Sequence, residues 1–118
     1  MAEPIRNAEE LQKQLGEFQD MQRQLQMITA QRQQLILQVE EIKLAESELG
    51  KTEKGIYRVV GPLLLECSKA DANADLKEKK ELFEMRISVL GKQDEKIRPK
   101  MDELRATLEK ALRENRPK

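Results

Sequence analysis

Histidine is absent from this sequence of 118 residues, and Cys67 is its only cysteine. One cysteine cannot form an intrachain disulfide. Without histidine, the chain also lacks the base that usually activates a serine or cysteine nucleophile and the mixed ligands of many zinc sites. We therefore expect a protein that is not an enzyme and that holds no metal and no cofactor.

Large rings and long apolar runs are also scarce. Tryptophan is absent, and the only aromatic residues are Phe18, Tyr57 and Phe83. Hydrophobic residues make up 38% of the chain and charged residues 37%, a poor supply for a thick globular core. The longest apolar run, 62–65, is far too short to cross a bilayer, and the first ten residues lack the apolar segment of a signal peptide. We expect an elongated helical protein in the cytoplasm, with no membrane partner.

Charge of one sign is not in excess, because 22 basic and 22 acidic residues give a formal net charge of zero. The distribution is nevertheless uneven: residues 1–49 hold 9 acidic and 5 basic residues, and residues 75–118 hold 10 acidic and 13 basic residues. This pattern suits two helices lying side by side better than it suits nucleic-acid binding, which usually needs a basic face with many phosphate contacts.

The first part of the chain, residues 7–49, is predicted to be a coiled-coil helix. Asn7 is a candidate cap with Glu10 three residues on, and no proline follows as far as Leu49. Steps of four and three mark the predicted stripe, which comprises Leu11, Leu15, Phe18, Gln22, Leu25, Ile28, Arg32, Leu35, Val39, Ile42, Glu46 and Leu49. The step from Leu25 to Ile28 is three where four is due, which predicts a loss of phase there.

The last part, residues 75–116, is predicted to be a second coiled-coil helix of similar length, with Asp75 as its cap. Two such helices are most simply folded back as an antiparallel pair in which the numbers of facing residues sum to about 123. Leu11 would then face Leu112, and Leu15 would face Leu108. Pro99 predicts a kink, at the same height as the loss of phase in the first helix.

The connector, residues 50–74, contains β-forming residues around the turn dipeptide Gly61-Pro62, and we interpret it as one β-hairpin with strands over 54–60 and 63–67. One hairpin cannot cover its own apolar residues, and its edges would stay unpaired. We therefore expect strands from other subunits to close a barrel with it; the alternative is a loop packed on the helices. The predicted oligomerisation residues are Ile56, Tyr57, Val59, Val60, Gly61, Pro62, Leu63, Leu64 and Leu65.

The order helix, "GIYRVVGPLLLE", helix, together with the run "LKEKKELFEMRISVLGKQDEKIRPKMDELRATLEKAL", resembles the prefoldin beta subunits of archaeal type. The resemblance covers essentially the whole chain as a single domain, 1–118. Alpha-type subunits of the family have two hairpins between their helices, so one hairpin indicates a beta subunit. The implied fold is mainly α: a long antiparallel two-helix coiled coil joined by one β-hairpin that assembles into an intersubunit β-barrel.

The resemblance also implies a function. Prefoldins are hexamers of two alpha and four beta subunits that capture non-native polypeptides without ATP and transfer them to a group II chaperonin. Clients are held towards the free ends of the coiled coils, and in this sequence the corresponding residues are Leu11, Leu15, Phe18, Met21, Leu25, Met101, Leu104, Leu108, Ala111 and Leu112. Each of these fits a plain coiled-coil core equally well. The alternative function is a structural scaffold or spacer that binds a folded partner.

Overall fold

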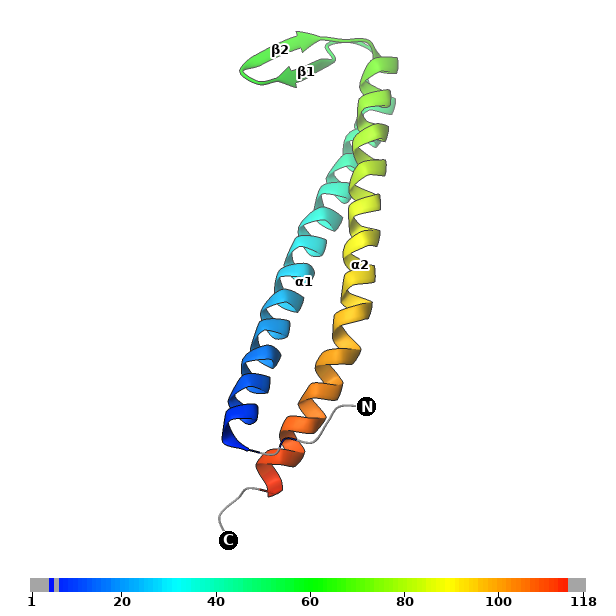
Figure 1. Cartoon of the computed structure of the whole chain (residues 1–118). Helices are drawn as coiled ribbons and strands as arrows, with labels where there is room; N and C mark the ends of the chain where they lie inside the picture. The colour runs from blue at the N-terminus through cyan, green and yellow to red at the C-terminus, as the bar shows by residue number, and fades with distance from the viewer. Residues whose placement is uncertain (1–4, 6, 115–118) are drawn as a thin grey trace. The chain divides into compact units, whose positions relative to one another are not determined.

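The computed structural model describes residues 5 and 7–114. Two long helices, α1 (Ala8–Lys51) and α2 (Lys69–Glu114), flank two short strands, β1 (Tyr57–Val60) and β2 (Leu63–Glu66), as Figure 1 shows. The strands pair antiparallel in a two-stranded sheet. This arrangement confirms the predicted helix, hairpin, helix order within one chain.

The chain divides into two compact units, which are described separately. We call Met1–Gln31 with Leu90–Lys118 the terminal unit, and Arg32–Val89 the hairpin unit. Each pairs a stretch of α1 with a stretch of α2. In the terminal unit the guanidinium of Arg105 lies 5.8 Å from the ring centre of Phe18, and in the hairpin unit Lys80 and Glu46 form an ion pair. The residue numbers of Phe18 and Arg105 add up to 123 and those of Glu46 and Lys80 to 126, in line with the predicted register.

Helix α1 begins where the sequence predicted. The backbone N–H of Glu10 donates a hydrogen bond of 2.8 Å to Oδ1 of Asn7, which confirms Asn7 as the cap. The helix ends at Lys51, two residues later than predicted. Its last turn is closed by the Thr52 hydroxyl, which donates a hydrogen bond of 2.8 Å to the carbonyl of Glu48.

Helix α2 begins six residues earlier than predicted, so Asp75 is not its cap. The backbone N–H of Asp71 donates a hydrogen bond of 3.1 Å to the Ser68 hydroxyl, which identifies Ser68 as the residue that caps the helix. The segment 70–74 contains three alanines, the best helix formers, so it joins the helix instead of forming the predicted connector. The connector between the helices is therefore 52–68 and not 50–74.

The buried stripe of α1 keeps one phase along the helix, so the predicted loss of phase between Leu25 and Ile28 is wrong. Leu15 and Gln22 are exposed, and their neighbours Gln14 and Met21 are half-buried in their place. Steps of three and four then alternate from Leu11 onward, with Arg32 as an exposed residue at one of these positions. The sequence prediction failed because Leu15 is more apolar than Gln14. The backbone keeps its period, and a glutamine occupies a stripe position.

Pro99 therefore has no irregularity opposite it in the predicted register. Helix α2 is continuous through Pro99, and this proline is exposed. The kink at Pro99 stays a prediction. No helix within the described part of the chain is both long enough and apolar enough to cross a membrane.

The hairpin turn is fixed by Gly61 and Pro62. Val60 pairs with Leu63, so Gly61 and Pro62 form the whole loop. Gly61 has φ of +59°, and the ring of Pro62 holds its own φ negative. Positive followed by negative φ is the pattern of a type II′ turn, which suits the twist of paired strands. The strands are shorter than predicted, and the left-handed φ of +74° at Gly55 explains why β1 does not start at Lys54.

Candidate functional site: the hairpin and the helix ends

The hairpin presents an apolar surface that this chain does not cover. All eight strand residues are exposed, and the exposed fraction reaches 74% for Val59 and 70% for Leu64. Exposed apolar patches of this kind mark interaction surfaces. Of the predicted oligomerisation residues only Ile56 is half-buried; the exposed ones are Tyr57, Val59, Val60, Gly61, Pro62, Leu63, Leu64 and Leu65.

One ion pair attaches the hairpin to α2, and two contacts of Lys69 join the start of α2 to the end of α1 and to the connector. Nη1 of Arg58 in β1 lies 3.3 Å from Oδ2 of Asp75 in α2. Nζ of Lys69 donates a hydrogen bond of 3.1 Å to the carbonyl of Gly50 and lies 3.8 Å from a carboxylate oxygen of Glu53. These groups are partly exposed, so they add little stability but restrict how the hairpin is oriented.

A groove of about 840 Å³ lies between β1 and the adjoining ends of the two helices, all within the hairpin unit. Its helical wall includes Leu49 of α1 and Ala72, Leu76 and Leu82 of α2. Leu82 is 40% exposed. The apolar surface of the hairpin thus continues into the groove.

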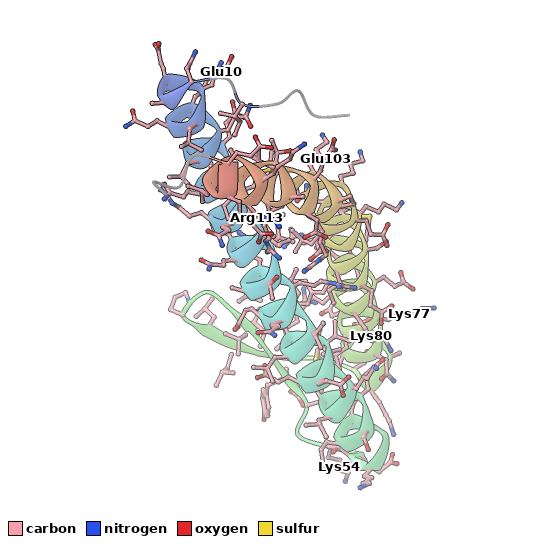
Figure 2. All side chains as sticks on the ribbon, turned by 90° about the horizontal axis from the view of Figure 1, so that it is seen from below. Glu10, Lys54, Lys77, Lys80, Glu103 and Arg113 are labelled. Atoms are coloured by element: carbon pink, nitrogen blue, oxygen red, sulfur yellow. The ribbon has the colours of Figure 1, made fainter. Side chains whose placement is uncertain are left out.

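Two charged residues at stripe positions of the hairpin unit form an ion pair with each other. Nζ of Lys80, labelled in Figure 2, donates a hydrogen bond of 2.8 Å to Oε1 of Glu46 on the facing helix. Both side chains are about a quarter exposed. The hydrogen bond to Glu46 raises the pKa of Lys80, so the lysine stays charged. Because each charge has one partner across the seam, this pair selects one register of the helices.

The predicted client-binding residues differ in burial within the terminal unit. Leu25, Met101, Leu108 and Ala111 are buried; Leu11, Phe18, Met21 and Leu104 are half-buried. Leu15 is 43% exposed and Leu112 55% exposed. Leu112 and Leu15 lie outside the buried stripe, so the facing of Leu11 with Leu112 and of Leu15 with Leu108 stays a prediction.

Gln14 is a feature that the sequence prediction missed. Its Oε1 is buried, and no hydrogen-bond partner for it lies within the described residues. A buried amide oxygen without a partner destabilises the packed state by about 1 to 3 kcal/mol. The signal was available in the spacing, because Gln14 follows Leu11 by three residues and precedes Phe18 by four. The seam of the terminal unit, that is, the packing of α1 against α2 there, is thus destabilised at Gln14.

Comparisons with known proteins match these features over nearly the whole chain. The profile of the family described as "Prefoldin subunit" matches residues 12–115. This chain belongs to the prefoldin subunit family. Its members are non-enzymatic chaperone subunits, and the one hairpin between two helices agrees with the beta type.

Prefoldin beta subunits of archaea are among the relatives. The chain is 39% identical over 106 residues to the prefoldin subunit beta of Thermococcus onnurineus, covering 88% of this chain and 91% of the relative. It is 36% identical to that of Thermococcus kodakarensis over the same shares. The crystal structure of the prefoldin beta subunit from Thermococcus strain KS-1 matches with a TM-score of 0.77 at 35% identity, covering 91% of this chain and 94% of the other. A prefoldin subunit of this kind assembles with other prefoldin subunits.

Proposed function

We propose that this chain is the beta subunit of a cytoplasmic, ATP-independent holdase. The complex is a hexamer of two alpha-type and four beta subunits, and it captures non-native polypeptides and transfers them to a group II chaperonin. The observation that supports this best is the hairpin, on which every apolar residue of both strands is exposed. Exposed leucines also occur at Leu15 and Leu112 of the terminal unit, although other apolar side chains, such as Leu44, are exposed along the helices. In this proposal the hairpin serves assembly and the helix ends serve clients.

Assembly uses the hairpin. A two-stranded hairpin with exposed apolar residues on both strands is marginal in water. Strands from neighbouring subunits bury these residues and pair the free edges, and closing the strands into a barrel leaves no edge unpaired.

Client capture uses the terminal unit. Leu15 and Leu112 are exposed in the closed seam and make first contact, whereas Leu108 and Met101 become available when the seam opens. Each apolar side chain buried against a client contributes about 1.5 to 3 kcal/mol before the entropy of association is subtracted. Contacts of this size are weak singly, and several subunits acting together supply the avidity.

The test compares exposed leucines in the two units. We expect the double variant Leu15→Ser, Leu112→Ser to assemble normally and to lose most of its ability to suppress aggregation of an unfolded client. The matched control is Leu44→Ser, since Leu44 is 69% exposed but lies in the hairpin unit. Equal suppression by both variants would refute capture at the helix ends.

A deletion experiment separates this function from that of a structural scaffold. Removing 1–18 and 105–118 should leave the hexamer intact and abolish aggregation suppression and client transfer to the chaperonin. A scaffold that binds one folded partner predicts instead that wild type has no measurable affinity for several unrelated unfolded clients.

A further inference from the structure

Arg105 of α2 contacts an aromatic ring of the facing helix. Its guanidinium lies 5.8 Å from the ring centre of Phe18, within the range of a cation–π interaction. Phe18 is half-buried and Arg105 is exposed. In the hairpin unit, the guanidinium of Arg86 lies 6.0 Å from the ring centre of Phe83, three residues before it on the same helix. Of the two pairs, that of Arg105 with Phe18 joins two helices, so it forms only while the seam of the terminal unit is closed.

Arg105 makes this contact although carboxylates are available on its own helix. Asp102 lies three residues before it and Glu109 four residues after it, the spacings at which opposite charges pair along a helix. Within the described part of the chain, however, the guanidinium forms no ion pair and no hydrogen bond. Because Arg105 is exposed, the side of its guanidinium that faces away from Phe18 is open to solvent.

Exposed leucines lie near this open side. Leu112 follows Arg105 by seven residues on the same face of α2 and is 55% exposed. On α1, Leu15 and Gln22 lie one turn before and one turn after Phe18, and both are exposed and uncharged. Seven residues of helix span about 10 Å, a distance that about three residues of an extended chain cover. A short client segment can therefore contact Leu112 and Arg105 together.

We propose that Arg105, held over Phe18, determines specificity at the client site and selects unfolded segments that carry an aromatic side chain. This inference rests on the proposed function, because it names the class of client that the helix ends hold. A client ring on the open side of the guanidinium gives the cation a second aromatic partner. An aliphatic side chain gains only burial there. A client carboxylate fits less well, because Asp102 and Glu109 repel it.

Isosteric peptides test the aromatic ring separately from its hydrophobicity. Two unfolded peptides carry either one phenylalanine or one cyclohexylalanine at the same position. The saturated ring has nearly the same shape and is more apolar, but it has no π system. Fluorescence anisotropy measures the affinity of each peptide for the assembled complex that contains this chain. We expect wild type to bind the phenylalanine peptide about threefold more tightly, and Arg105→Gln to reverse the order, since only apolar burial then decides.

Matched variants separate this contact from charge and from folding. Arg105→Lys keeps the charge but loses the planar group, so it should retain only part of the preference. Phe18→Leu keeps an apolar residue in the stripe but releases the guanidinium to Asp102 or Glu109, so it should also lower the preference. Arg86→Gln removes the cation of the pair in the hairpin unit and should leave the preference unchanged.

Four results would overturn the proposal. Equal or tighter binding of the cyclohexylalanine peptide by wild type, or no binding of either peptide, together with normal suppression of client aggregation, would contradict aromatic selection but leave the proposed function standing. An unchanged preference in Arg105→Gln would assign the selection to another residue. Tightest binding of a third peptide with glutamate at the same position would show that the guanidinium binds carboxylates instead. Failure of wild type both to bind the peptides and to suppress aggregation would refute the proposed function as well.

Discussion

Gln14→Leu should close the terminal unit and weaken client capture. The substitution removes a buried amide oxygen that has no hydrogen-bond partner within the described residues, which relieves a penalty of about 1 to 3 kcal/mol. Leucine has a similar size and belongs at a coiled-coil stripe position. Taking about 2 kcal/mol as the gain, the equilibrium for opening the seam falls by about 30-fold.

Hydrogen exchange measures this opening directly. We expect amides in 8–25 and 101–114 to exchange about 30-fold more slowly in Gln14→Leu than in wild type, since exchange at these positions reports local opening. Aggregation suppression should fall in parallel, because the buried members of the stripe reach a client only from the open state. The exchange of the strand amides in 57–66 should not change.

Gln19→Leu is the matched control. Gln19 is exposed, so this variant adds the same apolar side chain without altering the stripe. It should leave the opening equilibrium unchanged and hold clients at least as well as wild type. Unchanged protection in Gln14→Leu would refute the claim that Gln14 destabilises the seam. Increased protection with full client capture would show that capture does not depend on opening.

Four further predictions concern the hairpin unit. Glu46→Lys should lower the melting temperature and Lys80→Glu should restore it in the double variant, because the pair then re-forms with reversed charges. The hydrogen bond to Glu46 raises the pKa of Lys80 above its ordinary value of 10.5. The ion pair therefore stabilises the fold fully below that pH, and this stabilisation is lost as the pH rises through the higher pKa of the folded state. A wild-type melting temperature that shows no such alkaline loss relative to Glu46→Gln would contradict this. Arg58→Asp should weaken hexamer assembly, measured by analytical ultracentrifugation, and Asp75→Arg in the same chain should recover it; failure of the swap would show that the ion pair does not orient the hairpin. Ser68→Ala should destabilise α2 by about 1 kcal/mol in thermal melts followed by circular dichroism, whereas Asp75→Ala, inside the helix, should not remove a cap.

The sequence predicted the architecture because its strongest signals are local. Asn7 with Glu10 set the start of α1, and Gly61-Pro62 set the turn, since only certain backbone angles are open to these residues. The start of α2 was missed because two candidate caps, Ser68 and Asp75, follow the same rule. The helix propensity of the alanines between them decided in favour of the earlier one.

The seam was harder to predict than the helices that form it. Hydrophobicity favoured Leu15 over Gln14 by residue type, but the phase of a stripe is a property of the whole helix and is fixed by the residues that follow, from Leu25 to Leu49. A single polar residue at a stripe position costs less free energy than a shift of every later contact between the helices. The ion pair of Glu46 with Lys80 was not predicted for a related reason: each is a charged residue on the buried side of its own helix, and only the register of the two helices makes them partners.

The weak points of this chain lie where the proposed function needs them. A residue such as Gln14 lowers stability, and a long coiled coil built only for strength would replace it with leucine, as it would cover Val59 and Leu64 within its own fold. Both features cost free energy in the isolated chain, and under the proposed function this free energy is regained when a neighbouring subunit binds the hairpin and a client binds the helix ends. The proposed function therefore requires that assembly and client binding each raise the melting temperature of the unit that they cover, and do so independently. If neither unit is stabilised by the partner that covers it, the physical basis of the proposal is lost.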